Sequence, residues 1–204
     1  MKLLELFAGS RSVGKVAERM GIEVLSSDIN QFSDIKYVKN ILEFDFNELD
    51  FKPDIIWASP PCTAFSVAAM GHHWGGGYEA YIPKTETALL GIQIAKKTLE
   101  IIEHYKPKYF FIENPRGLLR KMDFMQKLPR RTISYCQYGD SRMKPTDIWT
   151  NNWLWIPRPI CKNGDACHEA APRGSRTGTQ GLSNAYERSK IPNLLCYEIL
   201  KSCI

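Results

Sequence analysis

The part of the chain between residues 3 and 115 alternates short apolar runs with helix-like stretches, and this alternation restricts the possible folds more than any other feature. The run DIIWAS at residues 54–59 is almost entirely apolar, which is typical of a parallel strand that is covered on both faces. The alternation predicts an α/β fold, in which a mostly parallel, doubly wound sheet carries helices on both faces.

Glycines, prolines and acidic residues mark the ends of the expected elements. Strands are expected at 3–7, 22–28, 37–45, 54–59, 108–115, 132–139 and 146–151, and helices at 13–20, 85–105 and 191–202. A glycine-rich loop precedes the longest helix, and a basic turn joins the last two strands. Between residues 152 and 188 the periodicity gives way to Pro, Gly, Cys and Arg, so no regular element is expected there.

Length and composition indicate one globular domain spanning 1–204. The chain has 204 residues, of which 44% are hydrophobic and 24% charged, and its net charge of +5 is compatible with a polyanionic partner. Its apolar runs are of strand length, which excludes a membrane partner, and the N-terminal run is too short for a signal peptide. We therefore expect a cytoplasmic protein whose six cysteines remain free thiols or serve as catalytic or metal-binding groups.

The ends of the parallel strands predict the position of a ligand site. In doubly wound sheets ligands bind beyond the carboxyl ends of the strands. The residues expected there are Phe7, Ala8, Gly9, Asp28, Asp45, Ser59, Pro60, Pro61, Cys62, Glu113, Asn114 and Pro115. Small residues after the first strand and an acid after the second fit a nucleotide cofactor, whose ribose hydroxyls Asp28 would bind. A tight turn with a solvated Asp28 explains the same residues equally well.

Cys62 and Glu113 are the residues that most suggest catalysis. A lone cysteine is more often a small buried hydrophobe, but Cys62 follows a buried strand and two prolines. Backbone N–H groups at such a strand end can stabilise its thiolate. Glu113 ends the neighbouring strand. A thiol nucleophile beside a carboxyl group suits attack on an electron-poor ring that is protonated as it is attacked.

Five segments together resemble the DNA cytosine-5 methyltransferases. In order they are LELFAGSRSVGKVAERMG, SPPCTAFS, FFIENPRG, YCQYGDSRMKPTDIWTN and RSKIPNLLCYEI. They cover the chain almost end to end, apart from residues 152–187, and the chain looks most like the short forms encoded by phages and prophages. The resemblance implies a Rossmann-like, S-adenosylmethionine-dependent methyltransferase fold and DNA as the partner. It also implies that the cytoplasm concerned is that of a bacterial cell or a phage-infected host.

The resemblance also implies a mechanism. Cys62 would add to carbon 6 of a cytosine that has been flipped out of the duplex, and Glu113 would hold the base through ring nitrogen 3 and the amine. Carbon 5 would then take the methyl group of S-adenosylmethionine, and loss of the carbon-5 proton would release Cys62. Arg142 is the third residue with an implied catalytic role.

The implied binding residues fall into two groups. Those that would bind the cofactor are Phe7, Ala8, Gly9, Asp28, Ile29, Asp45 and Pro60. Those that would contact the substrate are Ser59, Pro61, Asn114 and Lys144, together with His72, His73 and Trp74 in the glycine-rich loop. That loop lies where the family has its mobile catalytic loop, although a loop without nucleic-acid contacts explains the same residues.

The chain departs from the family pattern in three places. Ser10, Arg11 and Ser12 interrupt the usual FAGxGG, and Arg142, Lys144 and Thr146 stand where QxRxR is usual. Only the short, irregular segment 152–187 stands in place of a target-recognition domain. Recognition of a target DNA sequence is therefore limited, unnecessary, or supplied by a second protein chain.

Two interpretations of segment 152–187 remain open. Its aromatic and basic residues contact nucleic acid, or they form a solvated strap over the sheet edge. The residues concerned are Trp153, Trp155, Arg158, Arg173 and Arg176.

The stretch CKNGDACH raises the question of a metal site. Cys161, Cys167 and His168 supply three zinc ligands, and Cys136 is the one possible fourth, provided that its strand passes nearby. Because the spacing matches no common zinc motif, we expect free thiols and no metal, with zinc as the alternative.

Two further functions compete with DNA methylation. The absence of a full recognition segment between residues 152 and 187 favours RNA or a free cytosine nucleotide as an alternative substrate. The altered first motif favours a catalytically idle DNA-binding or regulatory homologue, although both Cys62 and Glu113 are present.

Overall fold

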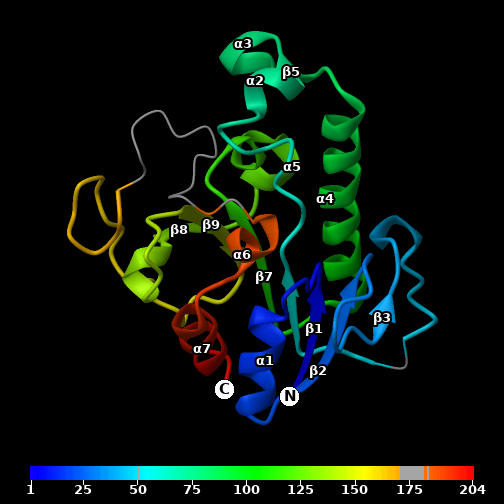
Figure 1. Cartoon of the computed structure of the whole chain (residues 1–204). Helices are drawn as coiled ribbons and strands as arrows, with labels where there is room; N and C mark the ends of the chain where they lie inside the picture. The colour runs from blue at the N-terminus through cyan, green and yellow to red at the C-terminus, as the bar shows by residue number, and fades with distance from the viewer. Residues whose placement is uncertain (50, 171–181, 183) are drawn as a thin grey trace.

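The computed structural model describes residues 1–49, 51–170, 182 and 184–204 (Figure 1). Its seven-stranded sheet has the order β3-β2-β1-β4-β7-β9-β8. The strands are β1 (Lys2–Leu6), β2 (Glu23–Asp28), β3 (Tyr37–Val38), β4 (Ile55–Ala58), β7 (Tyr109–Pro115), β8 (Arg130–Ser134) and β9 (Pro145–Thr150). The main helices are α1 (Ser12–Arg19), α4 (Glu86–Tyr105), α6 (Ala185–Ser189) and α7 (Asn193–Lys201).

The strand directions confirm the predicted mostly parallel, doubly wound sheet. The pairs β1·β2, β1·β4, β2·β3 and β4·β7 are parallel. Strand β9 runs antiparallel to both of its neighbours, so it is the one reversed strand of the described sheet. This order is that of a Rossmann-like methyltransferase sheet, with the reversed strand next to the edge.

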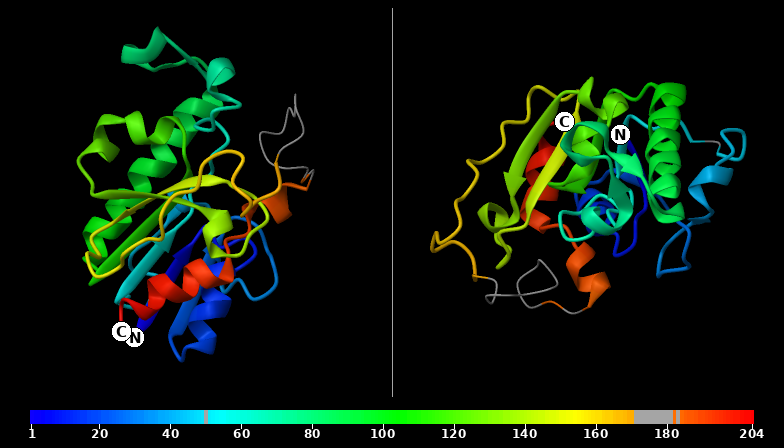
Figure 2. Two further views of the ribbon diagram at one scale, coloured as in Figure 1. Left: turned by 90° about the vertical axis from the view of Figure 1, so that its left-hand side faces the viewer. Right: turned by 90° about the horizontal axis from the view of Figure 1, so that it is seen from above.

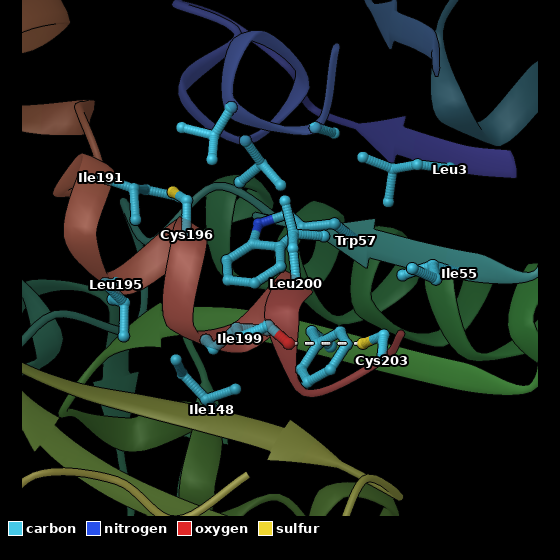
Figure 3. Close-up of a cluster of buried hydrophobic side chains, with 14 of the residues drawn as sticks. Leu3, Ile55, Trp57, Ile148, Ile191, Leu195, Cys196, Ile199, Leu200 and Cys203 are labelled. Carbon is cyan, nitrogen blue, oxygen red and sulfur yellow. Dashed lines mark hydrogen bonds between the residues drawn. The ribbon is translucent and has the colours of Figure 1, made fainter. Parts of the chain in front are cut away.

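Helices cover both faces of the sheet. Consecutive residues of β4 point to opposite sides: Trp57 packs in the cluster under α1 and α7, whereas Ile56 packs in the cluster under α4. Figure 3 shows the first of these clusters, where side chains of α7 lie against Trp57. Figures 1 and 2 show α1 and α7 together on one face and α4 on the other. Burial on both faces explains why the central strands are continuously apolar.

Several predicted elements differ from the observed ones. The expected strand at 37–45 is only two residues long, because the Asn40 side chain accepts a hydrogen bond from the Leu42 amide and starts a 3₁₀ turn, η1 (Ile41–Glu43). The expected strand at 132–139 ends at Ser134, where the 3₁₀ helix η3 (Tyr135–Tyr138) begins. Gly139, with a φ of 85°, then reverses the chain.

The glycine-rich loop has structure of its own. It contains α2 (Met70–His73), β5 (Trp74–Gly75), α3 (Gly77–Ala80) and β6 (Ile82–Pro83), and β5 pairs with β6. Figures 1 and 2 show it projecting beyond the N-terminal end of α4. Thr85 caps α4 there, since its hydroxyl accepts a hydrogen bond from the Ala88 amide at 3.2 Å.

Residues 151–170 contain no helix or strand. Trp155 is buried with 2% exposure and joins the cluster around α7, so of the two open interpretations nucleic-acid contact does not apply to it. Trp153 is 67% exposed. Arg158 forms an ion pair with Glu198 of α7 and stacks on Tyr138, which fits the strap interpretation. Arg173 and Arg176 lie outside the described residues.

No helix among the described residues combines the length and apolar character that crossing a membrane requires.

Helix α7 offers a matched test of this packing. Leu195 is fully buried, whereas its neighbour Leu194 is 38% exposed. We expect Leu195→Ala to lower the free energy of unfolding by about 2–5 kcal/mol, because it removes buried methyl groups and leaves a cavity. Leu194→Ala should cost less than about 1 kcal/mol. Denaturant unfolding of both variants measures the difference, and equal losses would contradict the assigned packing.

Candidate active site

A cavity of about 1450 Å³ lies at the carboxyl ends of β1, β2, β4 and β7. It is large enough to hold a cofactor and a base side by side. Its wall includes these predicted site residues: Phe7, Ala8, Gly9, Asp28, Ile29, Ser59, Pro60, Pro61, Cys62, Glu113, Arg142 and Lys144. The structure thus brings together side chains from segments that are up to 137 residues apart (7 to 144), as expected for a doubly wound sheet.

Cys62 reaches the cavity from the loop that follows β4. The loop is held from below, because the buried Asn114 side chain donates a hydrogen bond to the Pro60 carbonyl at 2.8 Å. The Cys62 carbonyl also accepts hydrogen bonds from the Phe65 and Ser66 amides, which close a turn directly after Cys62. Asn114 does not line the cavity, so the structure gives it a positioning role where substrate contact was predicted.

The surroundings of Cys62 favour its thiol form. Burial raises the pKa of the Cys62 thiol above its ordinary value, and the negative charge of Glu113 raises it further. The positive charges of Lys144 and Arg188 act in the opposite direction. The thiol is therefore placed between a carboxylate and two cations, and its reactivity depends on their balance.

Glu113 is held in place by a residue that the sequence did not indicate. The hydroxyl of the buried Tyr135 donates a hydrogen bond to Glu113 Oε1 at 2.8 Å. Burial and the charge of Glu113 raise the pKa of Tyr135 well above its ordinary value, so Tyr135 remains a donor. Because only one carboxylate oxygen has this partner, the other can face the cavity. The only signal for Tyr135 in the sequence was its place in the YCQYGD segment.

The turn between β1 and α1 forms the opposite end of the cavity. Phe7, Gly9 and Arg11 all have positive φ, which lets the chain turn sharply after β1. Asp28 of β2 accepts a hydrogen bond from the Gly9 amide at 3.0 Å and fixes this turn from the side. The buried Glu5 carboxylate accepts hydrogen bonds from the amides of Val13 and Gly14, at the start of α1.

Arg11 shows how the departure from FAGxGG is accommodated. Its backbone is left-handed, with a φ of 54°, and its side chain is buried. The guanidinium donates to Ser26 Oγ and forms an ion pair with Glu18 of α1. The altered motif therefore keeps a tight turn that is held by bonds within the β1–α1 region.

Arg142 is engaged on nearly every side. It donates to Asp140, and it also donates to the backbone carbonyls of Arg188 and Lys190. Lys144 donates to the same Arg188 carbonyl at 3.2 Å. These bonds fasten the segment between α6 and α7 to the cavity wall. They favour a positioning role for Arg142 over direct contact with a substrate.

Four other predicted residues lie away from the cavity. Asp45 does not line it, because its carboxylate accepts hydrogen bonds from Asn47 and closes a turn. Trp74 is buried against Phe65 and donates to the Ala64 carbonyl, so it is not available to nucleic acid as predicted. His73 is bonded to Thr85, and His72 is exposed on the projecting segment.

The cavity wall also contains residues that sequence reasoning missed. Asn40 and Ile41 stand near the place expected for Asp45, and Phe32 and Tyr186 meet at a ring-centroid distance of 6.0 Å. Arg188 comes from α6. These residues lie in loops or in helical turns of at most five residues, whose positions depend on distant contacts, so no periodic pattern could have indicated them.

A family model for the C-5 cytosine-specific DNA methylases matches residues 1–129. The match covers more than half of the 204 residues. The chain belongs to this family. It is therefore a methyltransferase by family. The resemblance rested on Cys62, in the loop after β4, and on Glu113, near the end of β7.

Two relatives are viral. The chain is 29% identical to a probable DNA (cytosine-5)-methyltransferase of Frog virus 3 (isolate Goorha), over 221 residues and the full length of both proteins. It is 24% identical over 173 residues to the type II methyltransferase M.CviJI of Paramecium bursaria Chlorella virus IL3A, covering 79% of this chain and 44% of that protein. The Frog virus 3 protein is thus a short form that is matched over its full length, whereas M.CviJI is more than twice as long as the part that is matched.

Two solved structures are also similar. The S. pombe Dnmt2 methyltransferase has 17% sequence identity and a TM-score of 0.49, and the match covers 74% of this chain and 48% of that chain. A Spodoptera frugiperda DNMT2 variant has 18% identity and a TM-score of 0.48, with 80% and 56% covered. This chain thus spans about half the length of both structures.

The charges around Cys62 predict how its reactivity depends on pH. The thiolate fraction rises as pH passes upward through the thiol pKa, so alkylation of Cys62 should have a midpoint above that of an ordinary thiol. Glu113→Gln should move this midpoint down, because it removes a negative charge, and Lys144→Met should move it up. Mass spectrometry of the Cys62 peptide after timed alkylation gives each profile. Shifts of the reverse sign would contradict the assigned electrostatics.

The close contact between Gly117 and Phe65 also stabilises the loop that carries Cys62. A Cβ at this position would lie 2.2 Å from the Phe65 carbonyl oxygen, which is backbone and cannot easily move away. Gly117→Ala should cost about 1–3 kcal/mol of unfolding free energy and displace the loop. Gly71→Ala is the matched control, since nothing lies within 4 Å of its added Cβ. Thermal unfolding compares the two, and an unchanged melting temperature for Gly117→Ala would refute the close contact.

Proposed function

We propose that this protein is a DNA (cytosine-5)-methyltransferase that uses S-adenosylmethionine and forms a covalent adduct through Cys62. The observation that carries the proposal is that Cys62 and Glu113 line the same cavity. They come from the carboxyl ends of adjacent parallel strands, β4 and β7, in which Ala58 pairs with Ile112. A thiol alone would not indicate this reaction. A thiol beside a fixed carboxylate, in a cavity with room for both cofactor and base, does.

In the proposed reaction Cys62 is the nucleophile and Glu113 binds the base. The Cys62 sulfur attacks carbon 6 of the cytosine, forming a C–S bond and sending electron density toward carbon 5 and the ring nitrogen 3. Glu113, oriented by Tyr135, donates a proton to that nitrogen and accepts a hydrogen bond from the exocyclic amine, and so neutralises the charge that develops on the ring. Once carbon 5 carries the methyl group, its proton passes to water and ring nitrogen 3 returns its proton to Glu113. The double bond between carbons 5 and 6 re-forms as the C–S bond breaks, and Cys62 leaves as the thiolate.

The β1–α1 end of the cavity fits S-adenosylmethionine. When bound, this cofactor supplies an electrophilic methyl group. Its ribose hydroxyls suit Asp28, and the short side chains of Ala8 and Gly9 let the backbone approach it closely. Pro60 would separate the cofactor from the base. Phe32 and Tyr186 would flank the adenine side, in place of Asp45, which does not line the cavity.

Basic residues around the cavity support a nucleic-acid substrate. Arg116, Lys144 and Arg188 all line it, and Arg116 is exposed at its rim. Their positive charge suits the phosphates on either side of a flipped base. DNA is the substrate we propose, because the family match and both viral relatives are described as DNA or type II methyltransferases.

The domain arrangement is also a proposal. A single methyltransferase domain spans residues 1–204, with 152–187 as a short substitute for a target-recognition domain. Of this segment, the described residues up to 170 form no element that could read bases in a groove. A second protein chain that supplies sequence recognition fits this arrangement.

Methyl transfer from labelled S-adenosylmethionine tests the proposal directly. Cys62→Ala should lower the rate by at least about 10⁴-fold while cofactor binding by calorimetry is retained, because the nucleophile does not bind the cofactor. Cys203→Ser is the matched control, since Cys203 lies in the core away from the cavity and should retain the wild-type rate. Full activity of Cys62→Ala would remove the covalent mechanism.

The choice of substrate has its own test. Duplex DNA, single-stranded DNA, transfer RNA and free cytidine nucleotide are compared under the same conditions. We expect incorporation of label into duplex DNA, with 5-methylcytosine as the only modified nucleoside. Preferential labelling of RNA or nucleotide would replace DNA as the substrate. Failure to bind S-adenosylmethionine would instead favour the idle homologue.

A further inference from the structure

Four potential metal ligands converge at the edge of the sheet, away from the active-site cavity. Cys136 lies in η3 after β8, and Cys161, Cys167 and His168 lie in the stretch that follows β9. Their ligand atoms all lie within 4.8 Å of one another. The condition set by the sequence, that the Cys136 segment pass nearby, is thus met. Figure 1 shows this stretch, in yellow to orange, alongside the turn after β8.

Of four ligand separations, three lie close to those around one tetrahedral ion, and the fourth, between Cys136 and Cys161, is shorter. Zinc bonds of about 2.3 Å to sulfur and about 2.0 Å to nitrogen separate sulfur pairs by about 3.8 Å and sulfur–nitrogen pairs by about 3.5 Å. The Sγ atoms of Cys136 and Cys161 are 3.1 Å apart, and those of Cys136 and Cys167 are 3.6 Å apart. His168 Nδ1 lies 3.8 Å from Cys161 Sγ and 3.6 Å from Cys167 Sγ.

From this geometry we propose that Cys136, Cys161, Cys167 and His168 form a structural zinc site. Three thiolates and one imidazole are a common ligand set for structural zinc and leave no open position for a substrate. On binding, zinc forms three Zn–S bonds and one Zn–N bond and displaces the protons of the three thiols into solvent. The preference for free thiols drawn from the sequence spacing is thereby reversed.

Backbone turns and hydrogen bonds hold the four ligand residues close together. Between Cys161 and Cys167 the chain makes a tight turn, in which the Lys162 amide donates to the Asp165 carboxylate and Gly164 has a φ of 94°. The Cys161 amide donates to Ser134 Oγ at 3.3 Å, which ties the turn to the end of β8. Gln137 donates to the Cys167 sulfur at 3.4 Å, a bond that would stabilise a thiolate.

The segment needs such a clamp because it buries little apolar surface. Ile156 and Ile160 are 81% and 58% exposed, and residues 156–170 have no regular hydrogen-bonded element. A metal can supply the folding energy that so small a core does not. The clamp would also fix Asn163, which lines the active-site cavity, and Glu169, whose amide donates to the Ser141 carbonyl next to Arg142. Zinc would thus hold one edge of the active site in place.

Metal analysis of the full-length protein, purified in reductant without chelator, tests the proposal without any activity measurement. We expect about one Zn²⁺ per chain by mass spectrometry. Replacement by Co²⁺ should give the d–d absorption of a tetrahedral site and a sulfur-to-metal charge-transfer band. Zinc content near zero, both as purified and after titration with Zn²⁺, would overturn the site.

Single substitutions separate this site from adventitious binding. Cys161→Ser and His168→Asn should weaken zinc binding by at least about tenfold in competition with a chromogenic chelator. His168→Cys should retain the ion, because it keeps four ligands. Cys203→Ser and Cys62→Ser are matched controls that should keep full zinc content, since neither thiol belongs to the cluster. Equal zinc loss in these controls would refute the assigned ligands.

Two further readouts keep the test decisive if a variant folds poorly. Cys167 is exposed, so Cys167→Ser should fold and still lose zinc. Chelation of the wild-type protein should raise amide exchange in residues 158–170 and leave the central strands unchanged. A Cys136–Cys161 disulfide found under reducing conditions would contradict the proposal. Because none of these readouts uses methyl transfer, their failure is distinguishable from failure of the proposed function.

Discussion

The parallel pairing of β1, β4 and β7, buried on both faces, is the constraint on which the rest of the structure depends. Parallel strands place all of their carboxyl ends at one edge, so the segments that leave β4 and β7 must meet there. Their side chains alternate between the cluster under α7 and those under α4, and a shift of one residue would exchange the two sets and disrupt the packing on both faces. This register therefore fixes Cys62 and Glu113 relative to each other.

Buried hydrogen bonds hold the residues of the active site in place. Asn114 holds the Pro60 carbonyl and Tyr135 holds Glu113, so both reacting groups are positioned by buried hydrogen bonds. Arg142 fastens the segment before α7 to the same wall through two backbone carbonyls. The zinc cluster would extend this bracing outward, to a segment that has almost no core of its own.

Much of the fold and site could be predicted from the sequence, and the failures share a cause. The strand at 54–59, the long helix and the Cys62–Glu113 pair follow from local patterns and were correctly placed. Trp74 was assigned to nucleic-acid contact through the family resemblance, and for Trp155 such contact was one of two open interpretations, yet both side chains are buried. Burial of an isolated aromatic in an irregular segment depends on which distant residues cover it, and no periodicity reports that.

The sequence by itself determined the doubly wound sheet, the strand ends that carry the reactive residues and the family resemblance. These are encoded over short stretches, by apolar periodicity and by turn residues such as Pro60 and Pro61. Only the tertiary structure decided that Tyr135 orients Glu113 and that Cys136 meets Cys161, 25 residues away. Such contacts arise because β9 returns between β7 and β8, and the spacing of residues along the chain does not specify where that return brings their side chains.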